Sequence, residues 1–452
     1  MKPQFIIAAP TSNSGKTTLT LGLLRALENR GVKTQPFKVG PDYIDPKFHE
    51  IASGKSGINL DLFMMDHQDI HATYESYTKQ VDVACVEGVM GLFDGARKSE
   101  GSTAELSKVL DLPIILVVDA KSVAYSVAPL LYGFKHFDKD IHIAGVIFNR
   151  VNTKSHYLFL QEACQDVGIP TFGHLPFIPE AEIPSRHLGL SIDKIEGYDT
   201  TIERVAEQLE QHVDIDLILK TCTKAEHQSE HQSEHQSEHQ SEHQLERNIK
   251  RQQTKRKIAI AKDEGFNFTY IQNIETLKEM GEIIFFSPMN DSVLPQADFV
   301  YLPGGYPECF TEQLSNNSTM LASIKAFAES GGHILAECGG MMYLGKSIID
   351  QSGNTFPMAN VFDFETSLQD MKLTLGYRRI QFEDFEWKGH EFHYSKLVGD
   401  ETSSSQATVY SAREKEVPTK VFRYKNVWAS YIHYYLGQKE LVEPLFKPNK
   451  TQ

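Results

Sequence analysis

The chain has 452 residues, which is too long for one ordinary hydrophobic core and predicts two to three domains. Its 45 lysines and arginines stand against 60 aspartates and glutamates, so the formal net charge is −15. Because nucleic acids and anionic membranes are themselves negative, this balance argues against both as partners, and an acidic substrate would need a local basic patch.

Cysteine use indicates a reducing compartment. The chain has five cysteines without a C-x-x-C pair, namely Cys85, Cys164, Cys222, Cys309 and Cys338. This scatter is typical neither of a disulfide framework nor of a zinc site. Met1 leads almost directly into the first apolar run, with no signal peptide or transmembrane segment ahead of it, so we expect a cytoplasmic protein.

The first predicted elements are a strand, a loop and a helix. Residues 5–9 form an apolar strand, residues 19–30 form an amphipathic helix, and Gly-Lys-Thr lies in the loop between them. This order is typical of a P-loop, although Pro10 stands where the usual pattern has glycine. We expect Lys16 to reach the terminal phosphates of ATP and Thr17 to bind Mg²⁺, because a lysine that merely caps a turn would not explain the threonine pair. The predicted nucleotide-binding residues are Ser12, Asn13, Ser14, Gly15, Lys16, Thr17, Thr18 and Lys38.

Apolar runs and helical patterns then alternate along the first half of the chain. The predicted strands are residues 34–39, 83–86, 113–119 and 141–148, and the predicted helices between them include residues 123–135 and 154–167. Strands rich in Val, Ile and Leu that alternate with helices predict a parallel sheet covered on both faces, which is a doubly wound α/β domain.

Carboxylates occur where two of these strands end. Asp42 lies just beyond the second strand, and Glu87 ends the third. The carboxyl ends of parallel strands line one crevice, so we expect both to face the nucleotide on the P-loop. Hard oxygen donors suit Mg²⁺, which makes Asp42 and Glu87 candidate metal ligands. For a single aspartate beside proline and glycine, the alternative is a turn residue.

A low-complexity segment separates the two halves of the chain. Between residues 226 and 244 the tetrapeptide Glu-His-Gln-Ser repeats, which would align the histidines on a helix as metal ligands. A polar repeat without an apolar face cannot bury a core, so we predict a disordered linker over residues 221–256, with metal binding as the minor alternative. The linker would divide a domain of residues 1–220 from a second alternating α/β domain of residues 257–452.

The second half contains a candidate nucleophile. An apolar strand leads into Ala-Glu-Cys-Gly-Gly around Cys338, and an apolar helix follows. A sharp turn at a cysteine between strand and helix is a nucleophile elbow, in which we expect the helix N-terminus to lower the pKa of the thiol. Gly304 and Gly305 offer N–H groups for an oxyanion, and His433 offers a base. For the cysteine alone, the alternative is inert core packing.

Cysteine, oxyanion loop and histidine in this order resemble the class I glutamine amidotransferases, in which the cysteine takes the glutamine amide as a thioester and frees ammonia. Together with the P-loop half, the chain resembles the cobyrinic acid a,c-diamide synthases. The segments that carry this resemblance span the chain apart from the linker; they are residues 38–46, 87–95, 101–106, 186–189, 263–268, 302–308, 337–344, 389–395 and 430–433.

The resemblance implies a P-loop ATP domain like that of dethiobiotin synthetase, joined to a class I glutamine amidotransferase domain. It implies ATP- and glutamine-dependent amidation of the a and c carboxylates of a corrin, through acyl phosphates, in cobalamin biosynthesis. Cys338 and His433 fall on the nucleophile and base of the family. Asp45 and Asp94 fall beside the substrate, and Arg186 is a candidate to hold a substrate carboxylate.

Several alternatives stay open. Hydrogenobyrinic acid or nickel-sirohydrochlorin could replace cobyrinic acid as the substrate, and a P-loop ATP switch with a degenerate amidotransferase module is a rival of another class. His433 is followed by Tyr434 and Tyr435, without the glutamate that many class I amidotransferases carry two residues after the histidine. A Cys–His dyad, or an acid from elsewhere, must therefore orient the imidazole. The route of ammonia and a homodimeric assembly are also left open.

Overall fold

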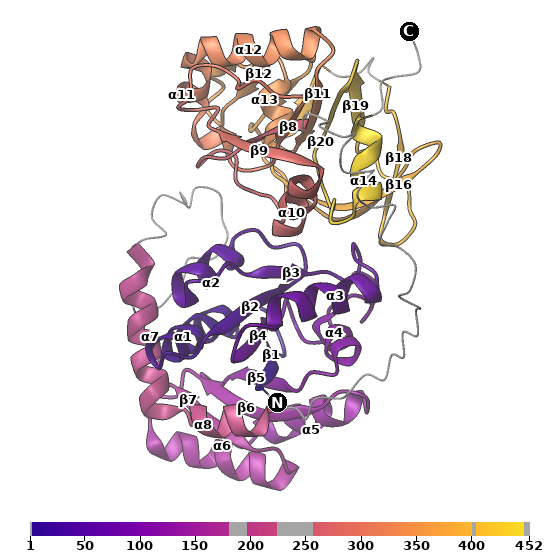
Figure 1. Cartoon of the computed structure of the whole chain (residues 1–452). Coiled ribbons are helices and arrows are strands. Elements are labelled where there is room, and N and C mark those ends of the chain that lie inside the picture. Colours follow the sequence, from indigo (N-terminus) through magenta and orange to yellow (C-terminus); the bar gives the residue numbers. More distant parts are fainter. Residues whose placement is uncertain (1, 180–196, 224–255, 400–403, 447–452) are drawn as a thin grey trace, which may run out of the picture.

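The computed structural model describes residues 2–179, 197–223, 256–399 and 404–446. These residues form an N-terminal and a C-terminal domain that lie against each other (Figure 1). The histidine repeat and Arg186 lie outside the described residues. No helix within the described part of the chain is long and apolar enough to cross a membrane.

The N-terminal domain is built on one parallel sheet of seven strands in the order β3-β2-β4-β1-β5-β6-β7. The strands are β1 Gln4–Ala8, β2 Thr34–Val39, β3 Ile58–Leu60, β4 Val83–Glu87, β5 Ile114–Asp119, β6 Ile143–Asn149 and β7 Thr171–Leu175. The helices are α1 Lys16–Asn29, α2 Asp45–Ser53, α3 His67–Thr78, α4 Thr103–Leu110, α5 Val127–Phe137, α6 Lys154–Val167, α7 Asp199–His212 and α8 Ile215–Thr221.

Both faces of this sheet are buried, as the continuous apolar strands predict. Along β1, Ile6 belongs to one hydrophobic core and its neighbours Phe5 and Ile7 belong to the other. The doubly wound parallel sheet predicted for the N-terminal half is therefore confirmed. The short strand β3 was not predicted, because three residues are too few to show a period.

The C-terminal domain has a central sheet of six strands in the order β19-β20-β11-β10-β8-β9, parallel except for the edge strand β19. These strands are β8 Arg256–Ala261, β9 Gly281–Phe286, β10 Phe299–Leu302, β11 His333–Glu337, β19 Val421–Tyr424 and β20 Val427–Ser430. The helices are α10 Ile271–Met280, α11 Thr311–Asn316, α12 Ser318–Glu329, α13 Gly339–Leu344 and α14 Lys439–Val442, with the 3₁₀ turns η3 Pro307–Cys309 and η4 Glu443–Phe446.

Two four-stranded sheets complete the C-terminal domain, in the orders β13-β12-β14-β17 and β18-β15-β16-β21. Their strands are β12 Ser347–Ile349, β13 Thr355–Pro357, β14 Glu365–Ser367, β15 Thr374–Gln381, β16 Glu386–His393, β17 Lys396–Val398, β18 Thr408–Ser411 and β21 Ile432–Tyr434. Strand pairing in them is mostly antiparallel, so the α/β alternation predicted up to the C-terminus stops after α13. The fold class is still α/β, with a β-rich addition.

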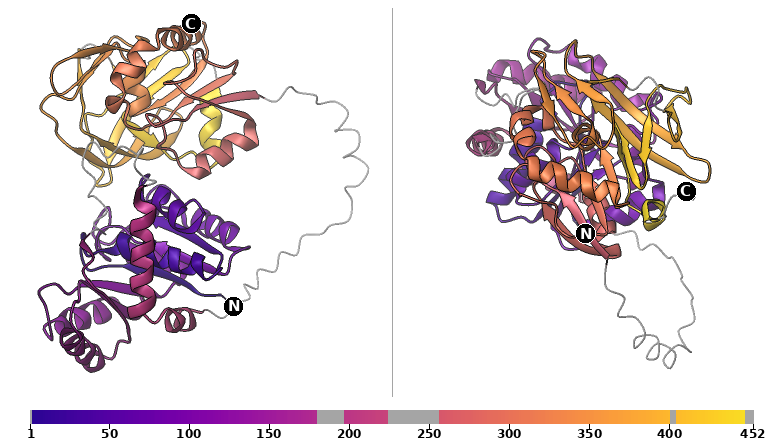
Figure 2. Two further views of the ribbon diagram at one scale, coloured as in Figure 1. Left: turned by 90° about the vertical axis from the view of Figure 1, so that its left-hand side faces the viewer. Right: turned by 90° about the horizontal axis from the view of Figure 1, so that it is seen from above.

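Helix α10 faces the N-terminal domain across the domain boundary (Figures 1 and 2). Polar and aromatic contacts from α10, from β15 and from the segment before α10 join the two domains. Gln272 Nε2 donates to the carbonyl of Asn59 at 2.7 Å, and Tyr377 donates its hydroxyl proton to Asp61 Oδ2 at 2.8 Å. Tyr43 stacks on Phe268, with ring centroids 5.3 Å apart. These contacts bring the loop that follows β2 against the C-terminal domain.

Candidate active sites

The P-loop lies between β1 and α1, with Lys16 as the first residue of the helix. Asn13 and Gly15 have φ angles of 63° and 89°, in the left-handed region. A Cβ at position 15 would lie 2.0 Å from Nδ2 of Asn149, so glycine is required there. Asn149, the last residue of β6, also donates a hydrogen bond from Nδ2 to the carbonyl of Ser14 at 3.0 Å. This bond holds the P-loop against the end of β6.

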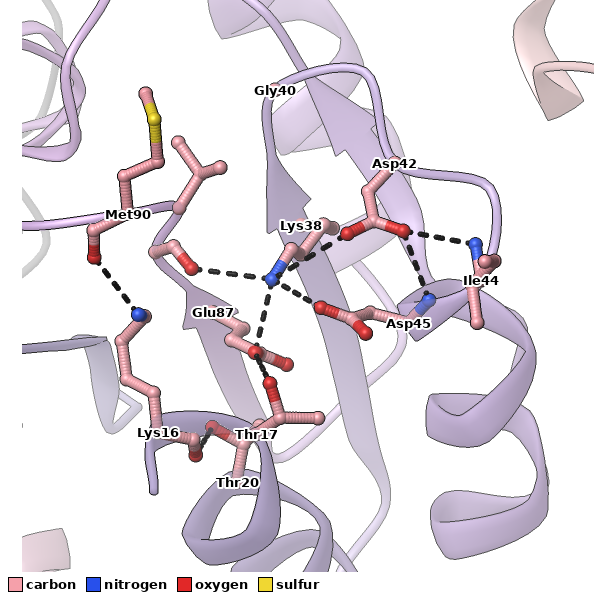
Figure 3. Close-up of polar contacts among 12 residues, drawn as sticks. Lys16, Thr17, Thr20, Lys38, Gly40, Asp42, Ile44, Asp45, Glu87 and Met90 are labelled. Carbon is pink, nitrogen blue, oxygen red and sulfur yellow. Dashed lines mark hydrogen bonds and ion pairs between the residues drawn. The ribbon is translucent and has the colours of Figure 1, made fainter. Parts of the chain in front are cut away.

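Lys16 and Thr17 point toward the loop after β4 (Figure 3). Lys16 Nζ donates to the carbonyl of Met90 at 2.9 Å, and Thr17 Oγ1 donates to Glu87 Oε1 at 2.6 Å. The P-loop hydroxyl and the carboxylate that ends β4, both candidate metal ligands, thus lie in direct contact.

Three carboxylates surround the ammonium group of Lys38 (Figure 3). Its Nζ lies 2.5 Å from Asp45 Oδ2, 2.9 Å from Glu87 Oε1 and 4.0 Å from Asp42 Oδ2. All four side chains are buried. Burial alone would raise the pKa of Glu87, but the charge of Lys38 and a hydrogen bond from His49 bring it below its ordinary value. The carboxylate is therefore ionised and available as a hard oxygen donor.

The remaining predicted residues of this half take different positions. Asp42 Oδ1 accepts hydrogen bonds from the N–H groups of Ile44 and Asp45, so the turn role of Asp42 coexists with its place in the cluster. Asp94 Oδ2 accepts from the N–H of Gly91 at 2.9 Å. Asp45 belongs to the cluster of carboxylates around Lys38, whereas Asp94 lies on the loop between β4 and α4.

The predicted elbow at Cys338 has the expected geometry. Cys338 joins β11 to α13 with φ 47° and ψ −102°, a strained conformation for a residue with a side chain. Its N–H donates to the carbonyl of Ser430 at 2.7 Å. A Cβ at Gly340 would lie 2.1 Å from the carbonyl oxygen of Leu302, which explains the glycine at the start of the helix.

The expected lowering of the thiol pKa is wrong for this structure. Burial, and after it the charge of Glu308, raises the pKa of Cys338 well above its ordinary value. The N–H of Gly339 acts in the opposite direction, but α13 is only six residues long and its dipole is small. The thiol is therefore protonated at rest and needs a base to remove its proton.

The predicted oxyanion loop and base lie beside the elbow. A Cβ at Gly339 would lie 3.2 Å from the amide nitrogen of Gly305, and a Cβ at Gly304 would lie 2.1 Å from Cε1 of His433. Gly304 and Gly305 therefore lie between the nucleophile turn and the imidazole. A developing oxyanion needs N–H donors at this position.

A carboxylate of the nucleophile strand lies next to the imidazole. Glu337, the last residue of β11, has its Oε2 atom 3.9 Å from Nδ1 of His433. Oε2 also accepts from the hydroxyl of Tyr301 at 2.8 Å, and Oε1 accepts from the N–H of Tyr434 at 3.0 Å. Burial raises the pKa of Glu337 to about 8 and lowers that of His433 well below its ordinary value.

The two halves of the molecule share a cavity of about 500 Å³. From the N-terminal domain it is lined by Asp42, Tyr43 and Asp94, and from the C-terminal domain by residues that include Arg413 and His433. The ring of Tyr43 packs on the His433 imidazole, with centroids 5.2 Å apart. A loop of the ATP side therefore touches the candidate base of the amidotransferase side.

Comparisons with known proteins match each half of the chain to a different family model. Residues 257–441 match the family model described as the CobB/CobQ-like glutamine amidotransferase domain. Residues 5–190 match the CobQ/CobB/MinD/ParA nucleotide binding domain. A cobyrinate a,c-diamide synthase of Caldanaerobacter subterraneus subsp. tengcongensis is 38% identical over 442 residues, which are 95% of this chain and 94% of the relative. The chain belongs to the a,c-diamide synthase family.

Other members of the family match over similar lengths. A hydrogenobyrinate a,c-diamide synthase of Brucella abortus is 39% identical, over 95% of this chain and 97% of the relative. A cobyrinate a,c-diamide synthase of Picrophilus torridus is 38% identical, over 98% of this chain and 97% of the relative. Membership in this family makes the chain a glutamine-dependent amidating ligase with a nucleotide-binding domain.

Some residues that build the two sites were missed by sequence reasoning. Asn149 supports the P-loop, His49 binds Glu87, and Glu337 and Tyr43 contact or approach the ring of His433. A signal existed for Asn149, because it directly follows an apolar strand whose carboxyl end faces the crevice. No local pattern marks His49 or Tyr43 as neighbours of residues far along the chain.

Proposed function

We propose that the chain amidates the a and c side-chain carboxylates of a corrinoid, with ATP and glutamine as co-substrates. The observation that carries this proposal is the shared cavity, in which the loops after β2 and β4 meet His433. Family membership and the two matched domains support it further. The experiment is incubation with cobyrinic acid, ATP and glutamine, followed by mass spectrometry, because each amidation replaces one hydroxyl group by an amine. Absence of an ATP-dependent diamide would contradict the proposal.

On the ATP side, the substrate carboxylate attacks the γ-phosphorus and ADP leaves, which gives an acyl phosphate. Ammonia then attacks the acyl carbon, and inorganic phosphate leaves as the amide forms. Lys16 and the N–H groups of residues 12–18 are proposed to bind the phosphates, with Lys38 beside them. Thr17, Asp42 and Glu87 are proposed to hold Mg²⁺, which would neutralise charge on the phosphates. The described residues contain no group of three or more His, Cys, Asp or Glu arranged to hold a metal. This fits Mg²⁺, which takes one or two carboxylates and the phosphate oxygens.

On the amidotransferase side, Cys338 is proposed to attack the carboxamide carbon of glutamine while His433 takes the thiol proton. The N–H groups at Gly304 and Gly305 would hold the oxyanion. His433 then returns the proton to the leaving nitrogen, so ammonia departs as the C–N bond breaks, and water later hydrolyses the thioester to glutamate.

Glu337 is proposed to orient His433 in place of the glutamate that is absent two residues after the histidine. The gap of 3.9 Å between Nδ1 and Oε2 exceeds a hydrogen bond by about 1 Å, and catalytic contacts often tighten when substrate binds. An acceptor at Nδ1 would leave Nε2 free to exchange the proton. The hydrogen bonds from Tyr301 and Tyr434 fix the carboxylate for this role.

The shared cavity is proposed as the acceptor site. Asp94 and Asp42 line it from the ATP side, and Arg413 offers a cation for a substrate carboxylate. Arg186 is proposed for the same purpose, and Asp45 is proposed to act beside the acceptor through its contact with Lys38. Because His433 lines the same cavity, released ammonia would need only to cross it.

The identity of the ring is a separate question, since relatives are named both for cobyrinate and for hydrogenobyrinate. Parallel incubations with cobyrinic acid, hydrogenobyrinic acid and nickel-sirohydrochlorin would decide which tetrapyrrole is turned over. A homodimer and a cytoplasmic location also remain proposals. Light scattering of the purified chain tests the first, and fractionation of cells tests the second.

A further inference from the structure

Glu308 lies in a 3₁₀ turn that packs against the start of the nucleophile helix. It is the middle residue of η3, whose Pro307 packs against the start of α13, since a Cβ at Gly339 would lie 2.7 Å from Cδ of Pro307. After burial, the charge of Glu308 is the largest cause that raises the pKa of both Cys338 and Tyr306. The charge of this carboxylate therefore acts on the thiol from a turn that contacts the start of α13.

One oxygen of this carboxylate has no partner. Oε2 of Glu308 is buried and forms no hydrogen bond with the described residues, and burial raises the pKa of the group to about 7. An unpartnered buried carboxylate oxygen costs free energy, and such groups are rare in native proteins. The structure thus keeps an unfavourable group beside the nucleophile.

The other carboxylates near the thiol are already used. Both oxygens of Glu391 are bonded, to His393 at 2.9 Å and to Arg378 at 2.6 Å. Both oxygens of Glu337 are bonded as well, to Tyr301 and Tyr434. Glu308 is therefore the acidic group beside Cys338 that keeps an open oxygen.

We infer that Glu308 binds the α-ammonium group of glutamine and so selects an amino acid amide over other primary amides. When the carboxamide of glutamine lies at Cys338, the ammonium group at the other end of the molecule must lose water, and a carboxylate is its natural partner. The ligand would also supply the missing hydrogen bond. This inference rests on the proposed glutaminase role of Cys338.

The test compares three amides in the full-length protein by the ammonia that each releases. They are glutamine, glutaramate, which lacks the amino group, and 4-aminobutanamide, which lacks the α-carboxylate. The parent protein should prefer glutamine to glutaramate. In Glu308→Gln, the KM for glutamine should rise about 10- to 100-fold, the range for loss of a charge-assisted hydrogen bond, while kcat changes little. The KM for glutaramate should stay within about twofold, so the preference for the amine disappears.

Glu312→Gln is the matched control, because Glu312 is an exposed glutamate on the next helix and the exchange should leave all three KM values unchanged. Equal use of glutamine and glutaramate by the parent protein would overturn the inference without any variant. A fall in kcat at unchanged KM in Glu308→Gln would overturn it too, since the group would then act in proton transfer. If Glu308→Gln fails to fold, Glu308→Asp takes its place, and it should keep the preference for the amine at a raised KM.

Failure of the proposed function looks different. A parent protein that releases ammonia from glutamine but forms no corrinoid amide would contradict the function and leave the inference about Glu308 intact. A parent protein without any glutaminase activity would overturn both.

Discussion

At the scale of single residues, burial decides the chemistry of the amidotransferase site. Cys338, His433 and Glu337 are each at most 5% exposed. Burial raises the pKa of Cys338 and Glu337 and lowers the pKa of His433, so it favours the neutral form of all three groups. A neutral thiol, imidazole and carboxyl group react only when a substrate aligns them and a proton moves between them. The site should therefore be slow until glutamine is bound.

Cys338→Ser should abolish glutamine-dependent amidation and leave the ammonia-dependent reaction, because the exchange removes the nucleophile without touching the ATP side. Amide formation measured with glutamine and with a high concentration of ammonium chloride separates the two activities. Full glutaminase activity in this variant would remove Cys338 from the mechanism.

Glu337→Gln should lower kcat for glutamine hydrolysis by at least about 10²-fold, the lower end of what a positioned proton-transfer group contributes, with KM changed little. Unlike a carboxyl group, an amide cannot ionise to offset the imidazolium charge that forms when His433 takes the thiol proton. Steady-state release of glutamate measures both constants.

Tyr301→Phe is the control for Glu337, since it removes a hydrogen bond to the same carboxyl group but keeps the carboxyl group itself. It should lower the thermal stability of the protein by the loss of about one hydrogen bond, about 1 kcal/mol, and reduce kcat much less than Glu337→Gln does. Equal losses of kcat in the two variants would show that Glu337 acts only as part of the core.

At the scale of elements, the ends of β1, β2 and β4 concentrate the charges of the ATP side. Because these strands are parallel neighbours, their carboxyl ends open at one edge, where α1 and α2 begin. Lys38 on β2 and Glu87 on β4 pair in register, which explains their ion pair at 2.9 Å. The sheet itself thus assembles the cluster.

Glu87→Gln should raise the Mg²⁺ requirement by about tenfold or more and slow both amidations alike, because charge develops on the transferred phosphoryl group in both. A Mg²⁺ titration of amide formation with ammonia as the nitrogen donor measures the effect. Titration like that of the parent protein would contradict the assignment of Glu87 as a metal ligand.

Asp94→Asn is the contrasting variant. Asp94 lines the shared cavity, so its exchange should weaken acceptor binding or stall the reaction at a monoamide while the Mg²⁺ requirement stays as in the parent protein. If the Asp94→Asn variant binds the acceptor normally and accumulates no monoamide, the proposed role of Asp94 in substrate binding is contradicted.

At the scale of the whole molecule, the interface places one active site against the other. Tyr43 belongs to the loop that carries Asp42 and leads into α2, yet its ring packs on His433 and on Tyr270 of the other domain. On the proposed mechanism, ammonia released beside His433 would enter a cavity that both domains line.

Tyr43→Ala should uncouple the two reactions, because loss of the ring opens the space between His433 and the acceptor loop to solvent. The ratio of glutamate released to amide formed should rise from about one to several. Gln438→Ala, which removes an interface hydrogen bond to Asp69 instead, is the control and should leave this ratio unchanged. An unchanged ratio in Tyr43→Ala would show that ammonia does not pass Tyr43.

Local patterns in the sequence were enough to predict the P-loop, the nucleophile elbow and the parallel sheet of the first half. Each depends on neighbouring residues, such as the glycine before Lys16 or the glycines after Cys338, and on apolar runs whose period is visible within a few residues. The antiparallel sheets of the second half were not predicted. Strands β15 and β16 mix polar and apolar residues with weak periodicity, and the short strands β18 and β21 join them from farther along the chain.

The sequence by itself therefore determined which residue types carry the chemistry and on which strand ends they lie. The tertiary structure alone decided what those residues touch, such as the approach of Glu337 to His433, the three carboxylates around Lys38 and the contact of Tyr43 with the other domain. It also decided the pKa of Cys338, where burial prevailed over the helix N-terminus. The physical reason is that motifs act over a few bonds, whereas contact and solvent exposure depend on how distant segments pack.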